Sequence, residues 1–367
     1  MTRRQMLGWL ARGVPALAVA PVLLGAQSRA RKRLGVCTYS YHLHWEVLRR
    51  GQRNGRFTDT VGFLDYCHQL GAGGAQIAID ARQPDEARRV RAKAEALQMY
   101  IEGQVSLPGR ESDLARFEAE IRAAREAGAA IVRTAMLSGR RYETFASAEA
   151  FRRFTEQSWQ SLKLAEPVVR RHRMRLAIEN HKDRRAAELL ELLRRIDSEH
   201  VGACVDFGNN LALLEEPMSV IEALAPYAVS THVKDMAVQE YAEGFLLSEV
   251  PLGQGALDLE RMFTVLEKAN PSLQWNLEMI TRDPLPVPCL TPGYWATLAG
   301  VPAPALAATL TWVRRHAAKQ PLPRASGLNL ERQLASEDAN VRASFAYARQ
   351  LRAAASPHTR SRRFAFS

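Results

Sequence analysis

The feature that most constrains the fold is a regular alternation of short apolar runs with segments of helical period, which begins at Arg33. The runs have the length of buried strands, and the segments between them repeat their apolar residues about every 3.6 positions. The sequence contains eight such runs: 34–40, 74–80, 99–105, 129–135, 175–180, 201–206, 228–233 and 273–279. Seven helical segments separate them, as expected if each strand is joined to the next by a crossover helix.

This alternation predicts an α/β fold, a (β/α)8 TIM barrel over residues 33–283. Eight parallel strands can close on themselves and leave no unpaired edge. An open doubly wound sheet is the competing architecture. It usually has fewer strands and a glycine-rich phosphate turn, and the sequence contains no such turn.

The character of the sequence changes after Met279. Residues 284–355 begin with a segment rich in proline and aromatic residues and continue with two helical patterns, at 303–317 and 329–353. We interpret this region as a C-terminal helical extension that packs on the barrel. Residues 356–367 then form a basic tail.

The first 30 residues have the layout of a bacterial export signal. Arg3 and Arg4 precede an apolar run of 14 residues, and no acidic residue occurs before Glu46. The paired arginines resemble a twin-arginine signal, which predicts a periplasmic or secreted protein. The alternative is an uncleaved anchor at the cytoplasmic face, although the apolar run is short for a membrane span.

The formal charge of +11 does not indicate a nucleic-acid partner. Four arginines lie in the predicted signal, which leaves +7 (11 − 4), and the rest are scattered on amphipathic segments such as 86–97, where they alternate with glutamate. A nucleic-acid footprint would need clustered basic residues with interleaved aromatics. The cysteines are far apart and form no CxxC pair, so we expect buried thiols: Cys37, Cys67, Cys204 and Cys289.

Four consecutive predicted strands end in residues that can bind a metal. They are Glu179, Asp206, His232 and Glu278. The first two spacings, 27 and 26 residues, each match one strand–helix unit, and the third is 46 because a predicted loop at 236–255 intervenes. In a barrel the carboxyl ends of the strands form the active site, so these side chains should meet there.

Three carboxylates at one place repel one another unless a cation or protons neutralise them. The residues therefore predict one divalent metal ion, with an oxygen-rich ligand set that suits Mn²⁺, Mg²⁺ or Co²⁺; Zn²⁺ remains possible. Three of the four residues also have a structural alternative: Asp206 as a turn former, His232 as a core histidine and Glu179 as an ion-pair partner.

The series of motifs at these positions resembles the sugar isomerase and epimerase branch of the xylose isomerase-like barrel superfamily. The motifs are IENH (178–181), CVDFGN (204–209), THVKD (231–235), LGQG (252–255) and LEM (277–279). The resemblance implies that the four residues hold one divalent cation and that two of them, Glu179 and Glu278, also transfer protons. Because a cation stabilises an enediolate, this predicts isomerisation or epimerisation of a sugar or sugar-derived hydroxy-ketone.

Two positions depart from the ketose 3-epimerase pattern. Asn209 stands where those enzymes carry a substrate-binding histidine, and Lys234 and Asp235 stand where they carry an arginine. Lys234 could neutralise a substrate carboxylate or an enolate oxygen, or form a salt bridge with Glu179 or Asp206. A free ketohexose substrate is therefore not supported.

Further polar residues should surround the same opening. His42 and His44 follow the first strand, and Arg282 follows the eighth, where it could meet an anionic substrate group or pair with Asp283. The predicted substrate-binding residues are His181, Asn209, Lys234, Glu102, Arg282 and His42. His181 could instead cap the next helix or bond to a neighbouring backbone.

Three other functions compete with the isomerase. A metal-dependent lyase, such as a decarboxylase of a 3-oxo sugar acid, would use the same enediolate chemistry. An abasic-site endonuclease would need a three-metal cluster with many histidines, and a non-enzymatic sugar-binding barrel would be expected to lack an intact metal set. We expect a small carbohydrate substrate, no nucleic acid, no stable membrane insertion after signal removal and a possible homo-oligomer.

Overall fold

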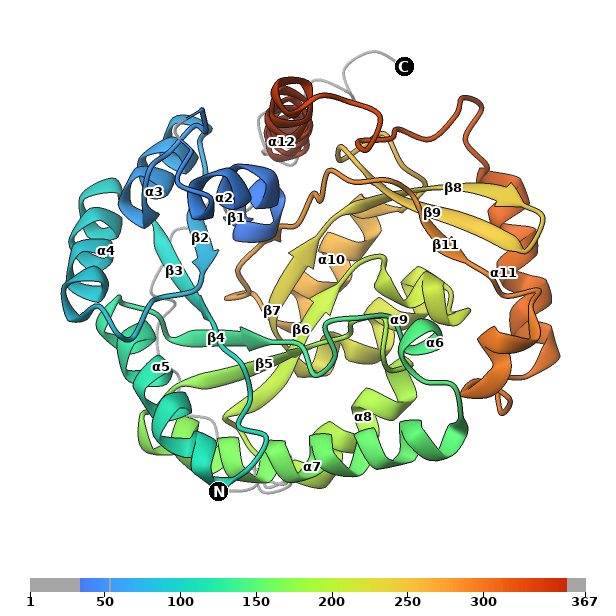
Figure 1. Cartoon of the computed structure of the whole chain (residues 1–367), viewed down its shortest axis with the longest axis horizontal. Helices are drawn as coiled ribbons and strands as arrows, with labels where there is room; N and C mark the ends of the chain where they lie inside the picture. The colour runs from blue at the N-terminus through green and yellow to red at the C-terminus, as the bar shows by residue number, and fades with distance from the viewer. Residues whose placement is uncertain (1–33, 53, 355–367) are drawn as a thin grey trace, which may run out of the picture.

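The computed structural model describes residues 34–52 and 54–354. In this part of the chain eight parallel strands close a barrel in the order β1-β10-β7-β6-β5-β4-β3-β2 (Figure 1). They are β1 (Gly35–Cys37), β2 (Gly74–Ile77), β3 (Tyr100–Gln104), β4 (Ile131–Thr134), β5 (Arg175–Glu179), β6 (Val201–Asp206), β7 (Ala228–Val233) and β10 (Asn276–Leu277). The predicted (β/α)8 fold is confirmed. The export signal predicted for 1–30 and the tail at 356–367 lie outside the described residues.

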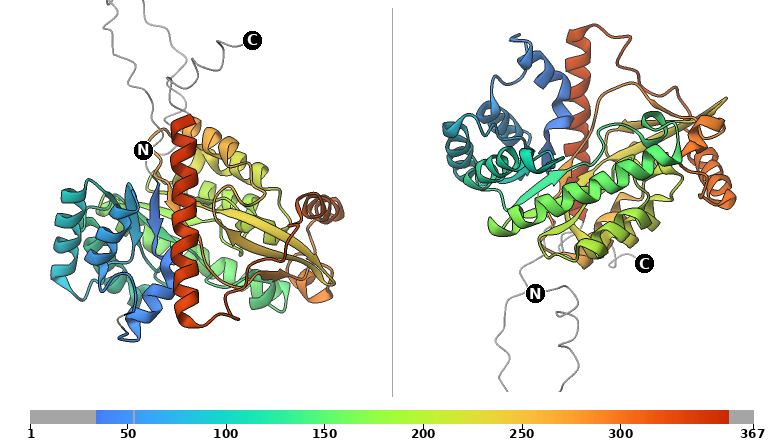
Figure 2. Two further views of the ribbon diagram at one scale, coloured as in Figure 1. Left: turned by 90° about the horizontal axis from the view of Figure 1, so that it is seen from above. Right: turned by 60° about the horizontal axis from the view of Figure 1, so that its bottom comes forward.

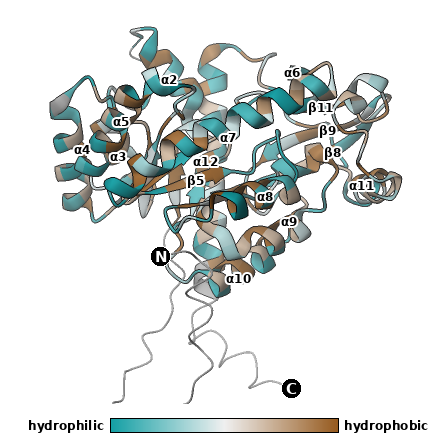
Figure 3. Ribbon diagram, turned by 90° about the horizontal axis from the view of Figure 1, so that it is seen from below, coloured by the Kyte–Doolittle hydropathy of each residue, from teal (hydrophilic) through white to brown (hydrophobic). Residues whose placement is uncertain are grey.

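Helices surround the barrel and pack their apolar faces against the strands. The seven predicted crossover helices are α3 (Thr60–Gln69), α4 (Pro84–Leu97), α5 (Leu114–Glu126), α7 (Ala148–Arg171), α8 (Ala186–Ile196), α9 (Pro217–Leu224) and α10 (Leu259–Ala269). In Figure 3 hydrophilic residues predominate along α7, the long helix outside the barrel. Side chains cap several helix starts: Asp59 accepts from Gly62 N, and Ser147 from Ala150 N.

Some short elements were not predicted from the sequence. The run 34–40 is a strand only to Cys37, because residues 38–41 form the 3₁₀ helix η1 (Thr38–Tyr41), followed by α2 (His42–Arg49). The others are α6 (Arg141–Thr144) and the 3₁₀ helices η2 (Glu111–Asp113), η3 (Asn209–Leu213), η4 (Ala225–Tyr227) and η5 (Pro292–Ala296). One or two turns are too short to produce a clear apolar period.

The segment predicted as a loop at 236–255 is mainly a β-hairpin, and that prediction is wrong. Strand β8 (Asp235–Tyr241) pairs antiparallel with β9 (Gly244–Val250), and β11 (Leu285–Val287) adds to the other side of β9. Gly244 allows the tight turn because its φ of 148° is one that other residues rarely adopt. The sheet buries Met236, Val238, Phe245 and Leu247 in a second apolar cluster with α11 (Ala303–His316).

Helix α12 (Leu330–Ala354) runs along one side of the barrel, next to η1 and α2 (Figure 2). Its carboxylate Glu337 is fully buried and accepts hydrogen bonds from Leu43 N, at 2.9 Å, and from His44 N, at 3.1 Å. The start of α2 lacks a side-chain cap from its own preceding residue, Tyr41. A distant helix therefore caps it.

Among the described residues, no helix combines the length and the apolar character needed to cross a membrane.

Candidate metal centre

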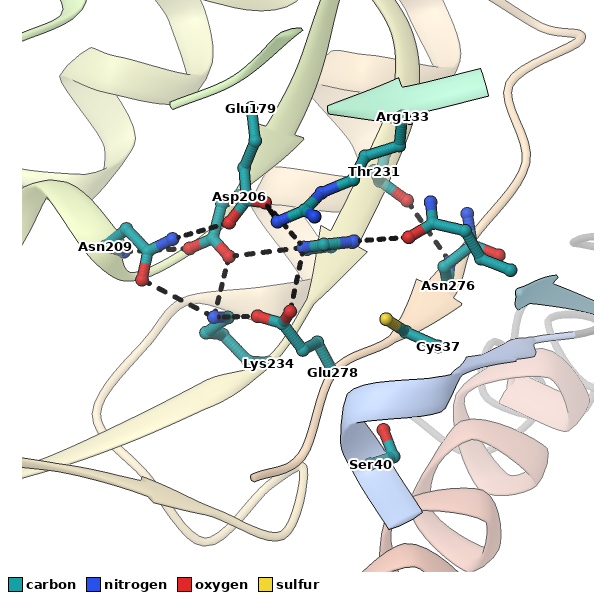
Figure 4. Close-up of polar contacts among 12 residues, drawn as sticks. Cys37, Ser40, Arg133, Glu179, Asp206, Asn209, Thr231, Lys234, Asn276 and Glu278 are labelled. Atoms are coloured by element: carbon teal, nitrogen blue, oxygen red, sulfur yellow. Dashed lines mark hydrogen bonds and ion pairs between the residues drawn. The ribbon is translucent and has the colours of Figure 1, made fainter. Parts of the chain in front are cut away.

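The four residues predicted at the strand ends meet in the structure. One ligand atom from each of Glu179, Asp206, His232 and Glu278 lies within 4.8 Å of the others. All four side chains are buried, with exposed fractions between 0 and 4%. Figure 4 shows Glu179, Asp206 and Glu278 pointing toward a common space from three strand ends. This cluster can hold one metal ion.

The strand register brings these residues to one height in the barrel. Asp206 pairs with His232 across β6 and β7, and Leu277 pairs with Val233, so that Glu278 follows directly at the end of β10. Glu278 N donates to Val233 O at 2.9 Å. Because side chains alternate along a strand, residues two apart, such as His232 and Lys234, face the same side of the barrel wall.

The hydrogen bonds of His232 prepare it as a metal ligand. Its Nε2 donates to Gln76 Oε1 at 2.8 Å, and the amide of Gln76 is oriented by donating from its nitrogen to Glu102 at 3.1 Å. In the neutral ring this leaves a lone pair on Nδ1, which lies 3.2 Å from Glu278 Oε1 and 3.4 Å from Glu179 Oε2. That nitrogen has no hydrogen-bond partner within the described part of the chain.

The donor set therefore fits a divalent cation. A lone pair and three carboxylates facing one buried space are electrostatically favourable only with positive charge between them. Burial lowers the pKa of His232, but Cys204 and Glu278 raise it further, to well above its ordinary value. Burial raises the pKa of Glu278, while His232 and Lys234 hold it well below its usual range. Both directions reflect a site that attracts cations.

Local structure orients Asp206. Its Oδ1 accepts from Gly208 N, at 3.0 Å, and from Asn209 N, at 2.8 Å, which leaves Oδ2 facing the cluster. Asn180 joins the ends of β5 and β6, because its side chain accepts from Asp206 N at 2.7 Å and donates to Asp206 O at 2.9 Å. Asp206 therefore has the local contacts of a turn former and is at the same time a candidate metal ligand.

Two buried cations neutralise the carboxylates in this structure. Lys234 Nζ lies 2.7 Å from Asp206 Oδ2 and 2.5 Å from Glu278 Oε2. One sequence alternative for Lys234, a salt bridge with Asp206, is therefore present, with Glu278 as a second partner. Arg133, from β4, donates to Glu179 Oε2 (Figure 4).

A second group of charged side chains adjoins the cluster. Asn209 Nδ2 donates to Glu179 Oε1 at 2.9 Å, and Asn209 Oδ1 accepts from both Lys182 and Lys234. Arg282 pairs with Glu249 of the hairpin, with Nε 3.1 Å from Oε2. The predicted alternative partner of Arg282, Asp283, instead accepts from the backbone of residues 325 and 326.

Glu102 lies deeper than predicted. It accepts from Ser230 at 2.6 Å, from Asn276 at 2.9 Å and from Gln76, in a polar layer inside the barrel, and it is 1% exposed. The prediction that it surrounds the opening is wrong. Gln104, two residues later on the same face of β3, is the side chain that reaches Cys37 and Thr38.

The histidines near the opening have different surroundings. The Nδ1 of His181 is buried without a hydrogen-bond partner in the described chain, and burial, Lys182 and Arg133 together hold its pKa well below the ordinary value. His42 Nε2 contacts Thr281 O at 2.9 Å. His44 points instead to Glu337 of α12, at 2.7 Å, so its predicted place at the opening is wrong.

Sequence reasoning missed three of the four polar residues that shape the site, and it considered the fourth, Lys182, only as an ion-pair partner of Glu179, whereas Lys182 contacts Asn209. The four are Gln76, Arg133, Lys182 and Glu249. Gln76 and Arg133 interrupt the apolar runs GAQIAID and AAIVRTA, where a polar side chain must face either solvent or a polar barrel interior. That signal was visible. The position of Glu249 depends on the hairpin and had no local signal.

Comparison with known proteins identifies the family of this barrel. A family model described as "Xylose isomerase-like TIM barrel" matches residues 64–315. The protein from Pectobacterium atrosepticum named 3-oxo-isoapionate decarboxylase is 29% identical over 236 residues, which cover 62% of this chain and 78% of that protein.

Solved structures are similar at the level of the fold. The crystal structure of a D-psicose 3-epimerase in the presence of D-fructose has a TM-score of 0.53 at 14% identity, covering 87% of this chain and 99% of that one. The 3-keto-D-glucoside 4-epimerase from E. coli has a TM-score of 0.51 at 15% identity, covering 78% and 100%. At this identity the likeness is one of architecture.

Proposed function

The chain belongs to the xylose isomerase-like TIM barrel family, and on this premise we propose that it is a divalent-metal-dependent isomerase or epimerase of a sugar-derived hydroxy-ketone. One observation carries the proposal: three buried carboxylates and an imidazole lone pair from four strands face one space. Glu179, Asp206, His232 and Glu278 are the proposed ligands. When bound, the cation would stabilise negative charge that develops on substrate oxygens.

Glu179 and Glu278 are the proposed proton-transfer residues. They come from β5 and β10, which are separated by two strands in the barrel order, so they can approach a substrate from different sides. Each has an oxygen held by a cation: Arg133 at Glu179, and Lys234 at Glu278. Burial raises the pKa of Glu278, but His232 and Lys234 lower it further, to well below its usual range, so this carboxylate is ionised and able to accept a proton from carbon.

A decarboxylase of a 3-oxo sugar acid is a second candidate. It is favoured by the name of the Pectobacterium relative and by the cationic side chains beside the site. In that reaction the bond to the carboxylate breaks, carbon dioxide leaves, and the electron pair of that bond passes into the ketone. A glutamate that has taken up a proton from water then protonates the carbon. Both candidates need the same ligands and differ in whether carbon dioxide is released.

Turnover in deuterated water tests the proposal. The Mn²⁺-loaded protein is incubated with ketoses, 3-keto-sugars and sugar acids, and products are followed by NMR. Deuterium at one carbon of an isomerised or epimerised product is expected, whereas release of carbon dioxide would assign the decarboxylase. Absence of both across the panel, with one Mn²⁺ bound per chain, would reject the enzyme proposal.

A further inference from the structure

With His232 in the neutral form that binds a metal, the charged side chains around the proposed metal site carry equal numbers of negative and positive charges. The carboxylates are Glu179, Asp206, Glu278 and Glu249, and the cations are Arg133, Lys182, Lys234 and Arg282. A divalent ion would therefore leave two excess positive charges in a buried space. A neutral sugar cannot offset them, whereas an anionic substrate can.

One of the four cations is left without a carboxylate. Arg133 pairs with Glu179, Lys234 with Asp206 and Glu278, and Arg282 with Glu249. Lys182 has no ion pair within 4 Å among the described residues, and its ammonium group meets only the amide oxygen of Asn209. The carboxylate next to it in the chain, Asp183, pairs with Arg184 at 3.0 Å.

The position of Lys182 directs it to the site and away from solvent. Lys182 is buried, with 2% of its surface exposed, and its backbone oxygen accepts a hydrogen bond from Arg141 N at 2.9 Å. The side-chain amide of Asn209 accepts a hydrogen bond from the Lys182 ammonium group, and it also donates one to Glu179, a proposed metal ligand, at 2.9 Å. Lys182 therefore lies beside the proposed metal site, because Asn209 contacts both its ammonium group and Glu179.

We propose that Lys182 binds a carboxylate of the substrate, so that the enzyme acts on a hydroxy-keto acid and not on a neutral ketose. This inference rests on the proposed function and specifies its substrate class. Lys234 Nζ also approaches Asn209 Oδ1, at 3.5 Å, so two ammonium groups share one neutral oxygen. A substrate carboxylate beside Asn209 supplies the counter-ion that this arrangement lacks.

The titration of Lys182 agrees with this geometry. Burial, followed by repulsion from Lys234 and Arg282, lowers the pKa of Lys182 to about 7. Without an anion the buried ammonium group is therefore weakly favoured, and a bound carboxylate would restore its protonated form.

A matched pair of ligands tests the inference. Hydroxypyruvate and dihydroxyacetone share a hydroxy-ketone, and they differ in whether a carboxylate or a hydroxymethyl group completes the molecule. Their affinities for the Mn²⁺-loaded protein are measured by calorimetry. We expect hydroxypyruvate to bind roughly tenfold more tightly or better, as one buried charge-assisted hydrogen bond allows.

Substitution of Lys182 tests whether this residue causes the preference for hydroxypyruvate over dihydroxyacetone. Lys182→Met should abolish the advantage of hydroxypyruvate and leave the affinity for dihydroxyacetone unchanged, and Lys182→Gln provides the same test if the first variant folds poorly. Lys268→Met, at an exposed position near the end of α10, is the matched control and should keep the preference.

Equal affinities in the unaltered protein, failure of both ligands to bind, or a preference that survives in the Lys182 variants would each overturn the inference. These outcomes are separate from failure of the proposed function. Deuterium incorporation with equal affinities would reject the carboxylate site alone. A Lys182-dependent preference without any turnover would reject the isomerase alone.

Discussion

Lys234 Nζ donates a hydrogen bond to Glu278 Oε2 at 2.5 Å. A positively charged side chain therefore contacts a carboxylate that is also a proposed metal ligand. The same ammonium group lies 2.7 Å from Asp206. In this structure Lys234 therefore neutralises two of the proposed metal ligands. Metal binding and this ion pair should compete with each other.

Removing the ammonium group should separate metal affinity from turnover. In Lys234→Met we expect Mn²⁺ to bind roughly tenfold more tightly, because a competing charge next to the ligands is lost. Turnover should fall, since Glu278 loses the group that keeps it ionised. Calorimetric titration with Mn²⁺ and an isomerase assay measure the two effects. Weaker Mn²⁺ binding would contradict the competition.

Glu278→Gln should keep the fold and abolish turnover. The amide has nearly the shape of the carboxylate but cannot accept a proton from carbon, so loss of activity by at least about 100-fold is expected. The far-ultraviolet circular dichroism should stay unchanged. Glu243→Gln, in the exposed turn between β8 and β9, is a matched control. Unchanged activity of Glu278→Gln would refute its assigned role.

Metal binding should stabilise the folded protein. A cation that binds only the folded state adds about 2.7 kcal/mol at a hundredfold excess over its Kd, which corresponds to a rise in Tm of roughly 3–4 °C for a chain of this size. Differential scanning calorimetry with and without Mn²⁺ measures this rise. Asp206→Asn should remove most of it. An equal rise in that variant would place the metal elsewhere.

Acid stability should depend on Glu249. Burial raises its pKa, but Arg282, Lys182 and Lys234 lower it further, to about 2. Because the folded-state pKa lies below the unfolded value, this stabilisation is complete above about pH 4.5 and is lost as the pH falls toward 2. Its size is on the order of 3 kcal/mol.

Urea unfolding at pH values between 2 and 6 measures the effect of Glu249. In Glu249→Gln the free energy of unfolding should change less across this range than in the unaltered protein. Asp80→Asn is an informative comparison, because Arg82 also lowers the pKa of Asp80 to about 2, although this pair lies on the surface. Identical pH profiles for Glu249→Gln and the unaltered protein would exclude a role for the buried pair.

The contact between α12 and α2 should contribute strongly to stability. Glu337 accepts from Leu43 N, His44 N and His44 Nδ1 and is fully buried. Glu337→Ala would leave these donors unsatisfied, and we expect it to destabilise the protein by roughly 2–4 kcal/mol. Chemical denaturation measures this loss. Glu331→Ala, exposed in the first turn of the same helix, should have little effect.

Much of the fold could be read from the sequence because its signals are local. The predicted strands at 201–206 and 228–233 and the predicted helix at 148–171 coincide with β6, β7 and α7. Apolar periodicity identifies each strand and helix separately. Eight alternating strand–helix units are the number found in a closed (β/α)8 barrel, so the count alone indicates this fold. The convergence of Glu179, Asp206, His232 and Glu278 follows from that count, because equivalent strand ends meet at one end of a barrel.

The tertiary structure alone decided how this cluster is neutralised and oriented. Arg133, Gln76 and Glu249 reach the site from elements far away in sequence, and their contacts depend on strand register and on the hairpin. Glu102 shows the same limit: its strand was predicted, but its depth in the barrel was not. The pattern of apolar and polar residues indicates on which face of a strand or helix a side chain lies. The contact partners of that side chain and its depth in the barrel depend on how several elements pack together, and no single segment of the sequence determines that packing.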